Sequence, residues 1–174
     1  MKNNKFLYIF LRYFLALILG INGLYFIYLI FEPLTLWGSY IILKLFYNVK
    51  LISETNILIV KDYSIEIVRA CVAGAAYYLL LILNLTTPME IKKRIKSFLV
   101  IIIGLFILNL IRITIFSILL INNFEYFDIT HKLFWYFGST ILVIFIWFGN
   151  VYLFNIRKIP VYNDFKEIYN LIKK

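Results

Sequence analysis

The sequence has few of the residues on which soluble enzymes and metalloproteins depend. It contains one cysteine, Cys71, and one histidine, His131, among 174 residues. A single cysteine excludes an intramolecular disulfide, and the pair excludes the Cys/His zinc patterns. Only 16% of the residues are charged, whereas soluble domains carry roughly 25%. The sequence therefore predicts neither a metal site nor a bound cofactor, and it lies outside the range of soluble globular domains.

Apolar residues are abundant, at 63% of the chain. A helix needs about 20 apolar residues to cross a bilayer, and three segments reach this length: Phe6–Phe31, Phe98–Ile121 and Leu133–Ile156. A fourth, Cys71–Leu85, is shorter but continuous. The remaining stretches are each under about 30 residues and too short to bury a core. We therefore predict an α-helical integral membrane protein in which residues 1–174 form a single polytopic domain with about four transmembrane helices.

The formal charge of +9 comes from basic residues clustered beside the hydrophobic segments. This distribution indicates membrane topology and argues against a nucleic-acid partner. The densest cluster, at 91–96, is expected in the cytoplasm, together with the N-terminus and a basic tail at 157–174. The loop Asn122–Asp128 carries two acids and no base and is expected outside. With both termini and the middle loop inside, the number of crossings is even, and four segments satisfy this condition.

Two outer segments are expected to lie between the first and second spanning helices. We expect Pro33 to end the first helix and Pro33–Val49 to be interfacial or re-entrant on the outer side, where its Trp and Tyr residues suit the headgroup region. Farther along, the β-branched runs Asn56–Val60 and Ser64–Val68 are separated by a short polar segment. This pattern predicts a small extracytoplasmic β-hairpin.

Arg112 is the most informative polar residue. An arginine inside a spanning helix costs about 2.5 to 3.5 kcal/mol and needs a partner or a wet cavity. A helix that enters the bilayer near Phe98 places Arg112 roughly 21 Å higher, in the outer third of the membrane. Asn109 lies three residues earlier on the same helical face. A functional polar site near the outer surface is therefore predicted on this helix.

Cys71 and His131 are expected at a similar depth. Cys71 is expected to open a descending helix below the hairpin, where the N-terminal N–H groups and helix dipole would stabilise negative charge on sulfur. Gly74 would let a neighbouring helix approach closely. His131 lies where the outer loop passes into the last helix. A thiol, an imidazole and a guanidinium in one layer make a coherent set of nucleophile, general acid/base and fixed charge.

These residues lie in motifs that resemble the exosortase/archaeosortase family of membrane transpeptidases. Its members have a cysteine motif after a short extracytoplasmic strand pair, an Asn-x-x-Arg motif and a later histidine. The matching segments here are Glu66–Gly74, Asn109–Ile113 and Thr130–Lys132, and the resemblance covers roughly Ile57 to Asn150. Many members have Cys-Ser-Gly or Cys-Thr-Gly, whereas this chain has Cys-Val-Ala-Gly. The small size and the Ile/Asn/Lys-rich composition favour the archaeal branch.

The resemblance implies a sortase-like reaction at the outer face of the cell membrane. Cys71 would cleave the C-terminal sorting signal of an exported protein, which consists of a motif, a hydrophobic tail and a basic end. A lipid or a cell-surface amine would then take the acyl group from the thioester. His131 would protonate the leaving amine and activate the acceptor, and Arg112 would stabilise the oxyanion. Three further residues are expected to bind substrate or support the site: Asn109, Gly74 and Glu66.

Two alternatives remain open on the sequence. One is a non-enzymatic membrane component, such as a transporter subunit or an assembly factor, in which Asn109 and Arg112 make a polar helix contact and Cys71 only packs. The other is a membrane cysteine protease that uses water as acceptor and therefore only hydrolyses. Access of an impermeant thiol reagent to Cys71 distinguishes the first alternative, and the new C-terminus of the substrate distinguishes the second.

Overall fold

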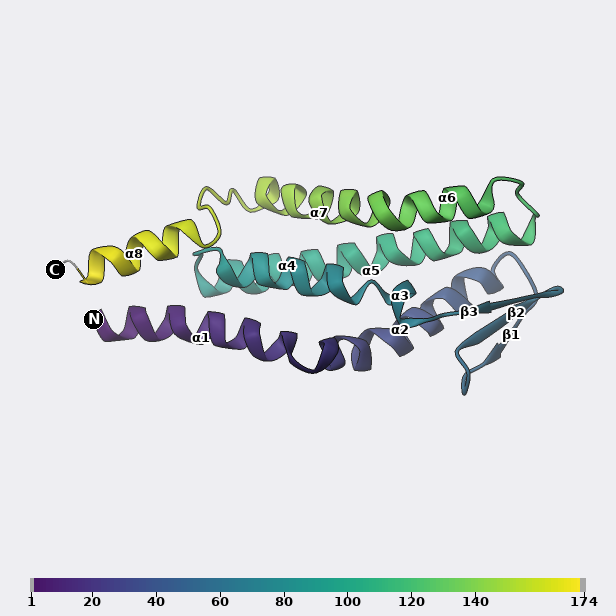
Figure 1. The fold of residues 1–174 in the computed structure, drawn as a ribbon, viewed down its shortest axis with the longest axis horizontal. Coiled ribbons are helices and arrows are strands. Elements are labelled where there is room, and N and C mark those ends of the chain that lie inside the picture. Colours follow the sequence, from purple (N-terminus) through teal and green to yellow (C-terminus); the bar gives the residue numbers. More distant parts are fainter. Residues whose placement is uncertain (1, 173–174) are drawn as a thin grey trace.

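In the computed structural model, which describes residues 2–172, the chain runs four times along an elongated helical bundle (Figure 1). The first pass contains helix α1 (Lys2–Gly20), a 3₁₀ turn (Ile21–Leu24) and α2 (Tyr25–Lys44). The second contains α3 (Arg69–Val72) and α4 (Gly74–Thr86), and the third is α5 (Ile91–Ile121). The fourth contains α6 (Phe127–Leu133), a π-helical turn (Phe134–Gly138) and α7 (Ser139–Leu153). Helix α8 (Tyr162–Ile172) follows.

Four helical segments of the described chain are long and apolar enough to cross a membrane: Tyr25–Lys44, Arg69–Thr86, Ile91–Ile121 and Phe127–Leu153. The predicted number of such helices is therefore confirmed. Two of these helices begin well before their predicted starts, α5 at Ile91 instead of Phe98 and the last span at Phe127 instead of Leu133. In both cases the helix continues through polar residues that hydropathy alone excludes.

The prediction for the first pass is wrong in two respects. The segment Phe6–Phe31 is not one helix, because the chain turns at Ile21–Leu24. Leu24 there has a φ of 64°, and the turn contains the Asn-Gly dipeptide that typically marks turns. Pro33 does not end a helix and Pro33–Val49 is not a separate segment, since α2 runs through Pro33 to Lys44. Packing holds the helix on the far side of the proline, where four side chains are buried: Thr35, Leu36, Ser39 and Leu43.

The predicted hairpin is present but belongs to a three-stranded antiparallel sheet. Strands β1 (Val49–Ile52), β2 (Ile57–Val60) and β3 (Tyr63–Glu66) lie in the order β1-β2-β3. Strand β1 was not predicted. The inner face of the sheet is apolar and packs against α2 and α5, in a core cluster of Leu36, Leu43, Leu58, Ile67 and Ile113. The sheet therefore caps the end of the bundle opposite the two termini (Figure 1).

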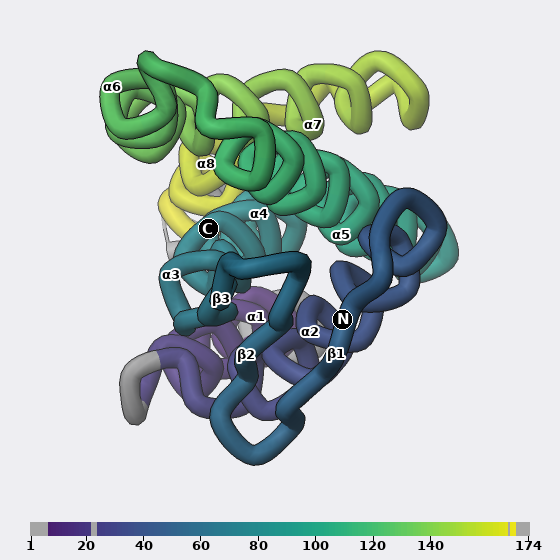
Figure 2. The backbone as a smooth tube through the Cα atoms, turned by 90° about the vertical axis from the view of Figure 1, so that its right-hand side faces the viewer, coloured from purple at the N-terminus to yellow at the C-terminus, as the bar shows by residue number. Residues whose placement is uncertain are grey.

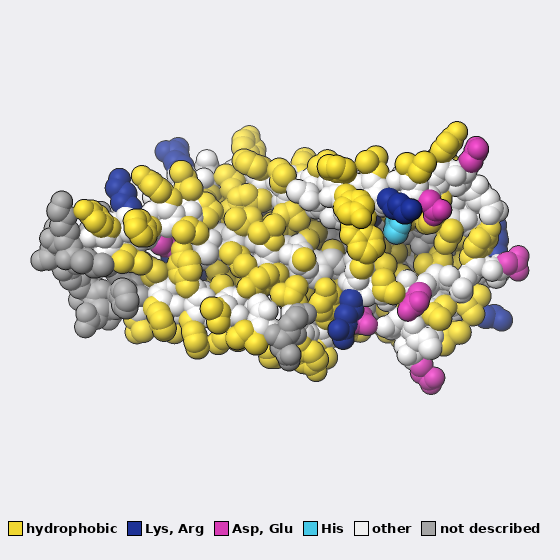
Figure 3. Space-filling model, in the orientation of Figure 1, with side chains coloured by type: hydrophobic (Ala, Val, Ile, Leu, Met, Phe, Trp, Pro, Cys, Tyr) yellow, Lys and Arg dark blue, Asp and Glu magenta, His cyan; other side chains and the backbone are white. Residues whose placement is uncertain are grey.

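The middle of the bundle is apolar inside and outside. Its core includes Ile27, Tyr77 and Leu105. Large hydrophobic side chains are also exposed along every pass, for example Leu29, Ile107 and Phe145. On the face shown in Figure 3, hydrophobic side chains cover the central zone and charged side chains gather towards the two ends. Such an extensive exposed apolar surface is unusual for a soluble monomer and is typical of contact with lipid.

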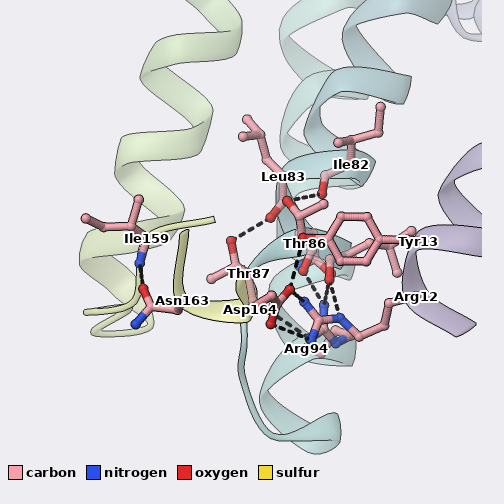
Figure 4. A network of polar contacts seen from close by, with 12 residues as sticks. Arg12, Tyr13, Ile82, Leu83, Thr86, Thr87, Arg94, Ile159, Asn163 and Asp164 are labelled. Carbon is pink, nitrogen blue, oxygen red and sulfur yellow. Dashed lines mark hydrogen bonds and ion pairs between the residues drawn. The ribbon is translucent and has the colours of Figure 1, made fainter. Parts of the chain in front are cut away.

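A buried polar network fastens α8 to the end of the bundle that carries the termini (Figure 4). Arg12 of α1 donates to Asp164 of α8 from Nη2 at 2.7 Å and from Nη1 at 3.3 Å. Its Nε also donates to the Leu85 carbonyl at 2.6 Å. Arg94 of α5 donates to the carbonyls that end α4, including Thr87 at 2.8 Å. Within the predicted basic tail at 157–174, the described residues thus include a docked helix.

Candidate active site

A cavity of about 260 Å³ lies at the sheet end of the bundle, and Cys71, Arg112 and His131 all line it. One wall comes from β3 and α3, the second from α5, and the third from α6, the π-turn and α7. Figure 2, which views the molecule from this end, shows β3 and α3 on one side and α5 with α6 on the other. The three residues that the sequence singled out, 60 positions apart at their extremes, thus come from three different elements around one space.

Cys71 lies in a single helical turn, α3, that is separate from the longer helix α4. Helix α3 ends at Val72, and α4 begins at Gly74. Between them Ala73 has a φ of 59°, a left-handed conformation that costs a residue with a Cβ about 1 to 2 kcal/mol. Cys71 therefore lies three residues before α4 begins, and the predicted stabilisation of its thiolate by a helix dipole stays a prediction. The break leaves the Cys71 carbonyl available to partners outside its helix.

Two side chains of α5 bind that carbonyl. Asn109 Nδ2 donates to the Cys71 oxygen at 2.9 Å, and Arg112 Nη2 donates to it at 3.2 Å. Asn109 is buried, whereas Cys71 and Arg112 are half-buried. The predicted Asn109–Arg112 face of the helix is therefore directed at the cysteine turn, and it holds the turn through its backbone, not through the thiol.

Ser139 is a site residue that the sequence did not indicate. Arg112 Nη1 donates to Ser139 Oγ at 3.1 Å, so the guanidinium joins α5 to both α3 and α7. A guanidinium has five N–H donors, and these two hydrogen bonds leave others for a ligand in the cavity. The arginine is thus held in one orientation from two sides.

The π-helical turn explains how Ser139 reaches the cavity. Each residue of an α-helix turns the chain by about 100°, and a π-turn takes roughly one extra residue. Residues after Phe134–Gly138 are therefore rotated back by about 100° relative to an uninterrupted helix. This rotation returns Ser139 to the face that carries Phe127 and His131, all of which line the cavity. Hydrophobic periodicity carries no signal for a π-turn, so Ser139 could not be predicted from the sequence.

His131 is set among aromatic rings. Its ring stacks on Phe127 with a centroid distance of 5.6 Å and meets the edges of Phe116 at 5.1 Å and Trp135 at 6.3 Å. Within the described chain no hydrogen bond joins the imidazole to the thiol of Cys71. Both residues line the same cavity.

The other two predicted supporting residues have different places. Glu66, at the end of β3, lines the cavity and is exposed. Gly74 does not line it. A Cβ added at Gly74 would lie 2.6 Å from the ring of Tyr28 on α2, so this glycine permits close packing of α4 against α2. That is the helix approach expected of a small residue.

The described residues contain no group of three or more His, Cys, Asp or Glu side chains placed to hold a metal ion. Comparison with known proteins adds no identity, since no family model, curated protein or solved structure matches the chain.

Proposed function

We propose that this protein is a multi-pass membrane cysteine transpeptidase whose active site is the cavity around Cys71, Arg112 and His131. The observation that carries the proposal is that the chain's single thiol, its single imidazole and an intramembrane guanidinium line one 260 Å³ space. Four helices suited to span a bilayer and the apolar outer surface support a membrane location. The basic clusters support a cytoplasmic location for the termini and an extracytoplasmic one for the site.

The proposed reaction has two half-reactions. The thiol of Cys71 gives its proton to His131 and its sulfur attacks a peptide carbonyl carbon, which creates an oxyanion. The C–N bond then breaks, His131 returns the proton to the leaving amine, and an acyl-thioester remains. In the second half-reaction an acceptor gives its proton to His131 and attacks the thioester carbonyl carbon. The C–S bond then breaks, and His131 returns the proton to the sulfur of Cys71. The net change exchanges one amine of the peptide for the acceptor.

Arg112 is proposed to stabilise the oxyanion in both half-reactions. It lines the cavity, and its contacts with Ser139 and the Cys71 carbonyl fix the guanidinium before substrate binds. Preorganised donors of this kind are effective because they need no reorganisation when charge develops. The contact with the cysteine's own carbonyl also fixes the distance between charge and nucleophile.

The family resemblance suggests the substrate and acceptor. We propose that the acyl donor is an exported protein with a C-terminal motif, hydrophobic tail and basic end, and that the acceptor is a membrane lipid or a cell-surface amine. The cavity lies at the sheet end of the bundle, opposite the termini (Figure 1). A tail that spans the bilayer beside the bundle could thus present its outer junction to Cys71.

The test compares exported proteins in cells that carry wild-type protein or Cys71→Ala. With wild type, we expect a set of exported proteins to lack their C-terminal tails, and with Cys71→Ala the same proteins should retain them. Mass spectrometry of the C-terminal peptides measures this, with Ser53→Ala, an exposed substitution in the β1–β2 turn, as control. Identical C-termini in both strains, with Cys71→Ala present in the membrane, would refute the proposal.

The same spectra separate transfer from hydrolysis. A transferred acyl group adds the mass of the acceptor to the new C-terminus, whereas hydrolysis leaves a free carboxylate. Reaction of Cys71 with a membrane-impermeant thiol reagent separates either enzyme from a non-enzymatic component in which the thiol is packed against lipid or protein.

A further inference from the structure

The outer edge of β3 has the properties of a peptide-binding edge. Within residues 2–172, β2 is the only strand paired with β3. The Ile67 N–H, just beyond β3, donates to the Asn56 carbonyl at 2.9 Å, on the side of β2. Residues of an antiparallel strand direct their backbone groups to alternate sides. Ser64 and Glu66 therefore direct their N–H and C=O groups away from β2, towards an edge that a further strand could pair with.

This edge runs along the proposed active site. Residues 65–68 line the same cavity as Cys71, and only Ile67 and Val68 separate β3 from the cysteine turn α3. The opposite wall is aromatic and includes Phe116, Phe134 and Trp135. An extended peptide paired with β3 would thus form backbone hydrogen bonds with the strand on one side. Its alternate side chains would be directed at the apolar wall.

We propose that the segment on the acyl side of the scissile bond binds as an additional strand on β3, running parallel to it. This inference rests on the proposed function, and it adds how the substrate is held. Strand β3 runs from the capped end of the bundle towards the helices (Figure 1). An exported protein whose C-terminal tail enters the membrane runs in the same direction at this point, so its strand is parallel to β3.

Pairing with β3 determines which features of the peptide the site recognises. Backbone hydrogen bonds to Ser64 and Glu66 hold any extended sequence, so they supply affinity without selectivity. Selectivity comes from alternate side chains, since every second one enters the cavity. The occupant is therefore an extended segment whose alternate residues are uncharged and apolar, with no proline at the paired positions.

A cysteine-trapping peptide tests this geometry. The probe is acetyl-Val-Ala-Val-Ala chloromethyl ketone, from which the thiol of Cys71 displaces chloride to form a thioether. Each amide of the probe is N-methylated in turn, and the labelling rate of Cys71 is divided by the rate with iodoacetamide, which has no strand to add. We expect methylation at alternate amides to slow labelling about tenfold, and at the intervening amides by less than about twofold.

Proline variants test the same edge from the protein side. Ser64→Pro removes an outward N–H while leaving the β2–β3 ladder intact, because proline is tolerated on edge strands. Ser53→Pro places the same residue in the exposed β1–β2 turn and is the matched control. We expect Ser64→Pro to lower the normalised rate with the peptide probe about five- to tenfold relative to Ser53→Pro.

The outcomes distinguish this inference from the proposed function. If all amides are equally sensitive to methylation, or Ser64→Pro and Ser53→Pro behave alike, strand addition is overturned while a thiol that reacts and processes substrate still supports the enzyme. If neither reagent reaches Cys71 in the folded protein, the enzyme itself is refuted, and strand addition with it.

Discussion

At the scale of single residues, the contacts of Arg112 bear on two possible roles, a positioned catalytic group and a simple counter-charge. Its guanidinium bonds the Cys71 carbonyl and Ser139 at the same time. Lysine keeps the positive charge but has one compact ammonium on a flexible stem, so it cannot reproduce a two-sided fork. The geometry of Arg112 is therefore proposed to matter as much as its charge.

We predict that Arg112→Lys accumulates normally in the membrane but processes substrate at least about a hundredfold more slowly, the typical cost of losing an oxyanion donor. Pulse-chase measurement of tail removal from an exported protein gives the rate. Lys44→Arg, at the exposed end of α2, is the control for an exchange between the same two residue types. Near-normal turnover by the lysine variant would demote Arg112 to a structural charge.

The residues around Arg112 show where sequence reasoning succeeds at this scale. Asn109 and Arg112 could be predicted to act together, because three residues along a helix define one face. Ser139 could not, because its direction depends on the π-turn at Phe134–Gly138. The partner of Asn109 was equally inaccessible, since the Cys71 carbonyl is available only because the helix breaks at Ala73.

At the scale of elements, the glycines of the long apolar helices differ in the space around them. A Cβ added at Gly38 of α2 would lie 2.9 Å from both methyl groups of Leu110 on α5. A Cβ at Gly104 of α5 would meet nothing within 4 Å. The first glycine thus sets the approach of α2 to the helix that carries Arg112, and the second has no such role.

We predict that Gly38→Ala lowers the free energy of unfolding by about 1 to 3 kcal/mol through overpacking. Gly104→Ala should be neutral or stabilise by up to about 1 kcal/mol, because alanine favours the helix. Unfolding of the purified protein in detergent micelles measures both. Equal stability of the two variants would mean that the contact between α2 and α5 relaxes without cost.

The docking of α8 gives a second test at this scale. The Arg12–Asp164 pair is buried, with side chains 6% and 2% exposed, whereas Arg69 and Glu32 lie 3.9 Å apart with Arg69 72% exposed. Removing one partner of a buried pair leaves a buried charge and costs about 3 to 5 kcal/mol. An exposed pair contributes about 0 to 1 kcal/mol.

We therefore predict that Asp164→Asn strongly destabilises the end of the bundle that carries the termini and speeds hydrogen exchange of backbone amides in α8. Glu32→Gln should have little effect on stability. Hydrogen exchange followed by mass spectrometry measures both variants. If α8 exchanges at the same rate in Asp164→Asn as in wild type, the ion pair does not hold the helix.

At the scale of the whole molecule, the sequence predicts the number of long apolar helices but not which helices, turns and strands make up each pass of the chain. Hydropathy identifies four long apolar helices because length and composition suffice for that. It misplaces the break in the first helical pass, because Pro33 is a stronger local signal for a helix end than the turn at Ile21–Leu24. Packing nevertheless keeps α2 continuous through Pro33. Hydropathy also misses β1 and the helical part of the basic tail, which are fixed by contacts with distant segments such as α1 and α2.

The topology makes one prediction on which the whole functional proposal depends. In a Cys71→Ala background the chain has no other cysteine, so single cysteines can be introduced without interference. Glu125→Cys lies in the loop after α5, next to the sheet end, and Lys92→Cys and Lys158→Cys lie at the opposite end of the bundle. All three positions are exposed.

Because basic loops stay in the cytoplasm, we expect a membrane-impermeant maleimide to label Glu125→Cys in intact cells and to label the other two only after permeabilisation. Labelling of Lys92→Cys or Lys158→Cys in intact cells, with Glu125→Cys protected, would place the Cys71 cavity on the cytoplasmic side. Exported proteins could not reach it there, and a transpeptidase acting on them would be excluded.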